Sequence, residues 1–307
     1  MIFLESEAIR VNMNPNDCKF HGRRTLAIGL AAALVLTMAA ACTVKTQPEE
    51  PSAAVTTPSQ TPEDTVAPAN APLVRAQRIL SPEETFSVRD RATGELVDCT
   101  FEVRALDEWD SNLYLTAAGQ EIAVVEIFSY LEEAKLLEFS DGSELVMFVL
   151  DEMSDDFYTC FCSVENGKPV LANEVYGSVT EIDLDGTAQL SLVVDVLGTW
   201  GAVRSYDLSS DGTMTPKPGS LYELIPYMPV EVGQAFRARF RDGGDWVEGT
   251  LEPGTQLYPT ATDQESFCLF RTVDGREGKI EFTMVDYMMY VDGVSVDELF
   301  VSLPYAG

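Results

Sequence analysis

Apolar and polar side chains alternate along much of this chain, and the alternation restricts the fold more than any other feature. Residues 190–196 and 280–284 each carry an apolar side chain at every second position. Successive side chains of a β-strand point to opposite faces, so this period of two predicts half-buried strands. Dipeptides that favour tight turns separate the alternating runs: Thr93-Gly94, Asn166-Gly167, Asp242-Gly243 and Asp274-Gly275. The sequence therefore predicts a mainly β protein.

One segment has helical spacing instead. Residues 130–139 (YLEEAKLLEF) place apolar side chains three and four positions apart, which predicts one short helix. The breaker sequence PKPG at residues 216–219 indicates a boundary between two β-rich domains. We expect residues 75–217 to form an open sheet or sandwich, and residues 218–307 to form a smaller β domain.

The start of the chain has the three zones of an export signal. Lys19, Arg23 and Arg24 precede an uncharged apolar run at residues 25–41, which ends in three alanines before Cys42. This junction resembles the lipobox of bacterial lipoproteins, although Ala39 stands where that family usually has leucine. The resemblance implies that residues 1–41 are a signal peptide and that the Cys42 thiol is lipidated after cleavage. Two alternatives stay open: an uncleaved membrane anchor, although the run is short for a span, and ordinary cleavage that releases a soluble protein.

Residues 42–74 would then be a tether between the lipid and the folded part. Repeated proline prevents helix and sheet there, and the segment has too little apolar content to form a core. Together these features predict a lipid-anchored protein on the extracytoplasmic face of a cell membrane.

Charge and histidine content exclude several classes of function. The chain has 20 Lys and Arg against 50 Asp and Glu, a formal net charge of −30, so phosphate backbones would repel it and nucleic-acid binding is not expected. The single histidine, His21, lies inside the predicted signal. The remaining chain therefore cannot build a Ser-His-Asp or Cys-His hydrolytic site.

Residues 229–282 resemble bacterial SH3-like domains. The shared motifs are Gly249-Thr250-Leu251, Gly254-Thr255, Leu257 and the run from Asp274 to Ile280. The resemblance implies a small β-barrel in which a short strand leads to a tight glycine turn and a second glycine, Gly278, precedes the last strand. Lys279 replaces the aromatic residue that usually follows the second glycine, which weakens any inherited pocket for a cell-wall peptide.

An Asp-Gly-Ser/Thr motif recurs at residues 141–143, 185–187 and 211–213. The middle copy resembles the D-x-D-G loop of integrin-type and related β-propeller repeats. That resemblance implies a partly propeller-like sheet within residues 75–217. It also implies calcium bound by Asp183, Asp185 and Thr187, because oxygen ligands at alternating positions suit this cation. The alternative is an ordinary Asp-Gly turn.

Three arginines occupy alternate positions of one predicted strand. Arg237, Arg239 and Arg241 would lie on the same face, with Trp246 nearby as an aromatic platform. They are candidates for binding a carboxylate or a polyanionic wall polymer through bidentate hydrogen bonds. Alternatively, they pair across strands with the abundant carboxylates of this protein.

Cysteines and acidic clusters complete the candidates. Cys99, Cys160, Cys162 and Cys268 are expected to be buried free thiols, with one disulfide from Cys99 to Cys160 or Cys162 as the alternative. Carboxylates at residues 107–110 and 151–156, with Trp109 or Trp200, are the ingredients of a secreted glycosidase. Acidic loops are common in so acidic a chain.

The sequence thus favours a binding or interaction protein over an enzyme. Its expected partners are the membrane, through the lipid, and a cell-wall polymer or surface protein. The alternatives are a carboxylate-based glycosidase and a calcium-stabilised sensor module, with calcium as the only candidate cofactor.

Overall fold

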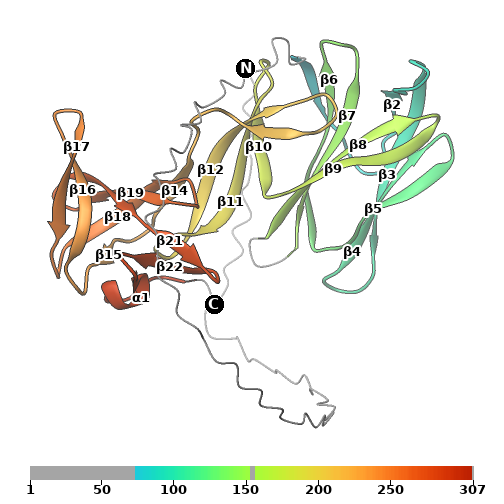
Figure 1. Cartoon of the computed structure of the whole chain (residues 1–307). Coiled ribbons are helices and arrows are strands. Elements are labelled where there is room, and N and C mark those ends of the chain that lie inside the picture. Colours follow the sequence, from blue (N-terminus) through green and yellow to red (C-terminus); the bar gives the residue numbers. More distant parts are fainter. Residues whose placement is uncertain (1–72, 153–155, 306–307) are drawn as a thin grey trace, which may run out of the picture. The chain divides into compact units, whose positions relative to one another are not determined.

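The computed structural model of this chain describes residues 73–152 and 156–305. Strands make up 65% of that part and helix 2%, so the predicted mainly β class is confirmed (Figure 1). No helix among the described residues is long and apolar enough to cross a membrane. The predicted signal peptide, Cys42 and all but the end of the tether lie outside the described residues.

The first half of the described chain contains two antiparallel sheets. One has the order β1 (Val74–Ile79), β6 (Tyr130–Phe139), β7 (Glu144–Asp151), β8 (Phe157–Glu165) and β9 (Lys168–Tyr176). The other follows chain order: β2 (Phe86–Arg89), β3 (Leu96–Ala105), β4 (Ser111–Ala117) and β5 (Gln120–Phe128). These two sheets share a hydrophobic core, named here the sandwich core, with Phe101 and Phe148 in edge-to-face contact. The sandwich expected for this region is therefore present.

The largest sheet, named here the long sheet, has eleven strands. Its main path runs β10 (Ser178–Ile182), β11 (Thr187–Asp195), β12 (Thr199–Leu208), β14 (Tyr222–Ile225), β18 (Gln256–Thr262), β19 (Phe267–Thr272), β20 (Glu277–Glu281), β16 (Phe236–Asp242) and β17 (Asp245–Leu251). Two short strands pair at its sides: β13 (Met214–Pro216) with β12, and β15 (Val230–Glu231) with β18. Gly201 of β12 pairs with Ile225 of β14, so one sheet continues across the boundary predicted at residues 217 and 218.

The end of the chain covers one side of the long sheet. It forms β21 (Thr283–Val285), β22 (Met288–Val291), β23 (Val294–Ser295) and the short helix α1 (Val296–Leu299). Leu299 and Phe300 enter a core with Phe236, Phe270 and other buried residues of the long sheet, named here the long-sheet core. No sheet of the described residues closes into a barrel, so the barrel expected from the SH3-like resemblance is not formed by these strands.

The predicted helix at residues 130–139 is wrong, because this segment is strand β6. It pairs with β1 on one side and β7 on the other, and both of its faces are covered in its second half. Leu136 belongs to the sandwich core, whereas Leu137 and Phe139 belong to a separate core between this sheet and β10–β12. Strand pairing and burial on two faces therefore override the helical spacing.

A buried carboxylate connects two turns of the sandwich. Asp90, at the end of β2, is 1% exposed. Its side chain accepts hydrogen bonds from the backbone N–H groups of Ala92 (2.8 Å), Thr93 (3.1 Å) and Gly167 (2.5 Å), the last in the β8–β9 turn. These amide donors, Gly167 first, lower the pKa of Asp90, because they stabilise the charged form.

Candidate ligand-binding face

The arginine stripe lies where the alternation placed it. Arg237, Arg239 and Arg241 are exposed on one face of β16, while Phe236 and Ala238 between and beside them are buried in the long-sheet core. The opposite strand, β17, places Thr250, Glu248 and Trp246 directly across from the three arginines. The face is therefore formed by two strands whose outward side chains match one to one.

Each arginine of the stripe has a carboxylate partner. Arg237 donates two hydrogen bonds of 3.0 Å to Asp292, and this contact raises the pKa of Arg237. The partners of Arg239 and Arg241 are Glu281 at 3.4 Å and Glu277 at 4.0 Å. The stripe thus follows the pairing alternative. Because these pairs are exposed, they contribute little to stability.

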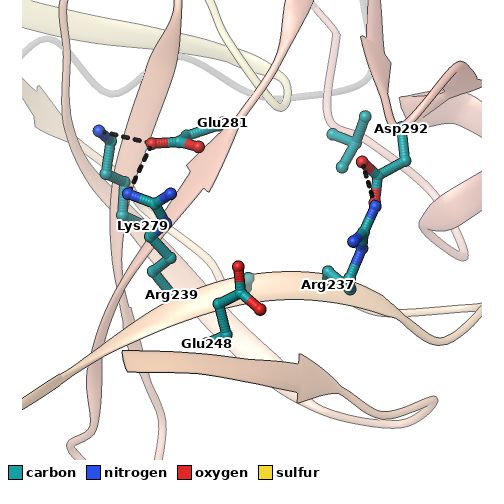
Figure 2. A pocket seen from close by; sticks show the side chains of 8 residues that line it. Arg237, Arg239, Glu248, Lys279, Glu281 and Asp292 are labelled. Atoms are coloured by element: carbon teal, nitrogen blue, oxygen red, sulfur yellow. Dashed lines mark hydrogen bonds and ion pairs between the residues drawn. The ribbon is translucent and has the colours of Figure 1, made fainter. Parts of the chain in front are cut away.

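A pocket of about 230 Å³ lies over the first two arginines. Figure 2 shows its lining, with Glu248 between Arg239 and Arg237. We call it the β16 pocket, and it is lined by Arg237, Ala238, Arg239, Glu248, Lys279, Glu281, Val291 and Asp292. The carboxylate of Glu248 lines this pocket. Within the described residues Glu248 forms no ion pair, so its oxygens are available to accept hydrogen bonds from a ligand.

Lys279 has a defined role in this pocket. Its Nζ lies 3.0 Å from Glu281 Oε1, the same oxygen that contacts Arg239, and 4.5 Å from the centre of the Phe267 ring. The hydrogen bond from Lys279, followed by the positive charge of Arg239, lowers the pKa of Glu281. The residue that departs from the SH3-like pattern therefore adds a cation to the pocket wall.

Arg241 and Trp246 line a second pocket of about 220 Å³, named here the Trp246 pocket. Its other walls are Thr260, Leu269, Phe270, Arg271, Glu277 and Gly278. Trp246 is 39% exposed, and the Arg241 guanidinium carbon lies 5.9 Å from its ring centre. The structure thus divides the four predicted binding residues between two neighbouring pockets.

The sequence did not indicate most partners of the stripe. The position of Glu248 could have been predicted, because this residue alternates with Trp246 and Thr250 along β17 and so shares their face. No sequence pattern predicts the position of Asp292. It lies 55 residues from Arg237 in the chain, and only the fold brings the two side chains together.

The predicted calcium ligands form an Asp-Gly turn. The carboxylate of Asp185 accepts the backbone N–H of Thr187 at 2.9 Å, and contact with Thr187 is the main cause of its lowered pKa. Lys217 Nζ donates to the Thr187 hydroxyl. An ammonium group beside this oxygen disfavours a second cation there. The described residues contain no group of three or more Asp, Glu, His or Cys side chains placed to hold a metal, and the calcium site stays a prediction.

The aromatic and acidic residues considered for a glycosidase have mostly structural roles. Trp200 is 1% exposed, so it is a core residue and not a sugar platform. The carboxylate of Asp107 accepts the backbone N–H groups of Trp109 and Asp110, which lowers its pKa. Glu152 has a pKa raised first by burial and then by Asp156, but residues 153–155 lie outside the described part.

All four cysteines of the described residues are buried free thiols, as the favoured interpretation expected. Cys160 and Cys162 point to one face of β8, where they join Cys99 in the sandwich core. Burial raises the pKa of Cys99 and of Cys160 to about 12, so these thiols are protonated and unreactive near neutral pH.

Comparison of the chain with models of protein families, with curated proteins and with solved structures finds no match. The geometry of the two pockets is therefore the basis for assigning a function.

Proposed function

We propose that this chain is a lipid-anchored protein of the extracytoplasmic membrane face, and that it binds cell-wall material without catalysis through the β16 pocket. The observation that carries the binding role is the pocket itself. It combines three cations, Arg237, Arg239 and Lys279, with the unpaired carboxylate of Glu248. A leader with basic, apolar and small-residue zones before Cys42 supports the location.

The charges of the pocket indicate what kind of group fits it. Arginine and lysine only donate hydrogen bonds, and an ionised carboxylate only accepts them. A ligand that both donates and accepts satisfies both walls, whereas a simple polyanion must displace the internal carboxylates from Arg237 and Arg239. Wall material, which carries hydroxyl, amide and ionised groups together, meets this requirement.

Carboxylate chemistry in the pocket supports binding over hydrolysis. A glycosidase needs one carboxyl group with a raised pKa to protonate the leaving oxygen. In the β16 pocket, Lys279 and Arg239 instead lower the pKa of Glu281. This carboxylate is ionised at neutral pH and suits hydrogen bonding to a ligand.

Purified peptidoglycan is expected to retain the protein. In a pull-down assay, replacing both Arg237 and Arg239 with alanine should reduce retention about tenfold, because hydrogen bonds from charged groups are lost. Arg78→Ala is the matched control, since Arg78 is an exposed arginine of β1 that pairs with Glu84 at 3.0 Å. Retention of the wild-type chain no greater than that of an unrelated protein of equal charge would exclude wall binding.

Lipidation is tested on the native N-terminus. Mass spectrometry of protein from the membrane fraction should find a chain that begins at Cys42 with a diacylglyceryl group on its thiol. Cys42→Ala should prevent lipidation, so the mature, lipid-modified chain should disappear from the membrane fraction. A native chain that begins at Met1, has no fatty acid and fractionates with cytosolic markers would contradict the proposed location.

A further inference from the structure

The β16 pocket is one end of a row of outward side chains that crosses the long sheet. Direct strand pairing connects Glu248 of β17, Arg239 of β16, Lys279 of β20 and Leu269 of β19. The pairing then continues through Ala261 of β18, Glu223 of β14, Val203 of β12, Ser191 of β11 and Ser178 of β10. Paired residues of neighbouring strands point to the same face, so nine strands contribute one continuous row.

The two faces of this sheet differ. None of the nine residues in the row is buried. The alternate positions, including Ala238, Phe270, Leu224 and Ala202, form the long-sheet core on the other side. The row therefore lies on a solvent-facing surface with a rigid, packed support.

Three pockets follow one another along the row. Lys279, in the β16 pocket, pairs with Leu269, in the Trp246 pocket. Leu269 in turn pairs with Ala261, which lines a third pocket of about 730 Å³ together with Glu223 and Val203. We call the third the β12 pocket. Neighbouring residues thus link all three pockets, and at about 4.8 Å per strand the row is about 40 Å long.

The two ends of the row have different charges. The β16 and Trp246 pockets contain arginine and lysine beside carboxylates. The β12 pocket contains Glu181 and Glu223 with the neutral polar groups of Thr180, Gln189 and Ser205, and no lysine or arginine of the described part of the chain lines it. A long polyanion would be repelled by Glu181 and Glu223 at one end. At the other end the three cations of the β16 pocket are balanced by the carboxylates of Glu248, Glu281 and Asp292, so neither a polyanion nor a polycation finds a net opposite charge there. A ligand that spans the row must therefore be uncharged along its length.

We infer that this face binds a linear, uncharged glycan strand that lies across the β-strands, from the β16 pocket to the β12 pocket. This inference rests on the proposed wall-binding function and names the wall component that is recognised. Sugar hydroxyl groups both donate and accept, so they pair with the guanidinium groups at one end and with the carboxylates at the other. Trp246, exposed beside the row, offers an apolar face to a sugar ring.

An extended peptide fits this row less well. Peptides usually join a sheet along an edge strand through backbone hydrogen bonds. On the face of the long sheet the backbone groups are used by the strand ladders, and only side chains are available to a ligand.

Oligomers of N-acetylglucosamine, from two to eight sugars, test the inference by calorimetry on the full chain in detergent. The octasaccharide should bind at least tenfold more tightly than the disaccharide. Arg239→Ala should weaken binding of the octasaccharide through the β16 pocket. Glu223→Ala alters the far end of the row, and Ala261→Arg alters its middle. Each substitution should reduce the affinity for the octasaccharide, and this reduction should be severalfold larger than the reduction for the disaccharide. Glu95→Ala, an exposed carboxylate of the sandwich, is the control.

The outcomes separate this inference from the proposed function. Affinity independent of oligomer length, or Glu223→Ala and Ala261→Arg variants that fold and bind the octasaccharide like wild type, would overturn the row as one site. Retention on peptidoglycan without binding to any oligosaccharide would also overturn it, while wall binding through the β16 pocket would stand. Tighter binding of an uncharged peptide than of the octasaccharide would replace the glycan as ligand.

Discussion

Replacing Gly278 with alanine is expected to destabilise the protein by about 3 kcal/mol, because the new methyl group has no space. A Cβ atom at this position would lie 2.1 Å from Cζ of Phe270 and 2.6 Å from Cε1 of the same ring. Phe270 is 1% exposed and packs edge-to-face on Phe240 with ring centres 5.8 Å apart, so moving its ring away from the new methyl group would disturb the long-sheet core. Urea unfolding of the two chains measures the difference.

Gly201→Ala is the matched control for this substitution. Gly201 also lies in a strand of the long sheet, but no atom lies within 4 Å of its added Cβ. Its replacement should change stability by less than about 0.5 kcal/mol. In a Phe270→Leu background the cost of Gly278→Ala should fall, since the ring that causes the clash is gone. An equal loss in both backgrounds would show that the ring is not the cause.

Asp90→Asn is expected to cost about 3 kcal/mol at neutral pH, since an amide nitrogen cannot accept the N–H of Gly167. In the wild-type chain one carboxylate oxygen accepts the N–H groups of Ala92 and Thr93, and the other accepts the N–H of Gly167. The single oxygen of asparagine can replace the first acceptor but leaves the N–H of Gly167, in the β8–β9 turn, unpaired. Asp98→Asn makes the same change at an exposed carboxylate of β3. Asp98 accepts a hydrogen bond of 3.0 Å from the hydroxyl of Ser87. The Asp98 variant should stay within about 0.5 kcal/mol of wild type.

The effect of Asp90 should also depend on pH in one direction. Its folded-state pKa is lowered from the ordinary value of 3.8, so the native state binds the proton less readily than the unfolded state. The stabilisation is therefore complete above about pH 4 and is lost as the pH falls below 3.8 through the folded-state pKa. Unfolding free energies of wild type and Asp90→Asn should converge in this acid range. A difference that persists unchanged at pH 2 would show that the charge of Asp90 is not responsible.

The alternation of apolar and polar residues predicts strands well where only one face of the strand is buried. Phe236 and Ala238 of β16 enter the long-sheet core while the arginines between and after them stay outside, as the period of two predicts. Ile280 and Phe282 also enter this core, but Met284, the third apolar residue of that run, lies in the next strand, β21, and is 42% exposed. Strand β6 has no such period, because Leu136 and Leu137 enter different cores on its two faces. Its leucine, glutamate and lysine residues also favour helix, so only its pairing with β1 and β7 determines its structure.

The candidate binding face could be predicted from the sequence only in part. The stripe of Arg237, Arg239 and Arg241 follows from local spacing, and so does its exposure. Its partners are distant in the chain: Glu281 ends β20, and Asp292 lies in the turn between β22 and β23. Only the register of the strands that carry them sets the contacts. The link to Glu223 and Val203 requires the complete order of the long sheet, which no local pattern contains.

The three cores close in a fixed order along the chain. The sandwich core is complete at Val164 and the core beside β10–β12 at Leu208, but the long-sheet core requires Phe300, which bridges to Val232. During synthesis from the N-terminus, the sandwich core can therefore pack early, whereas the long-sheet core cannot pack until Phe300 has been synthesised. The proposed ligand-binding surface is therefore supported only once Phe300 is in place, and a chain that stops before this residue would keep the sandwich core but leave this surface without its support.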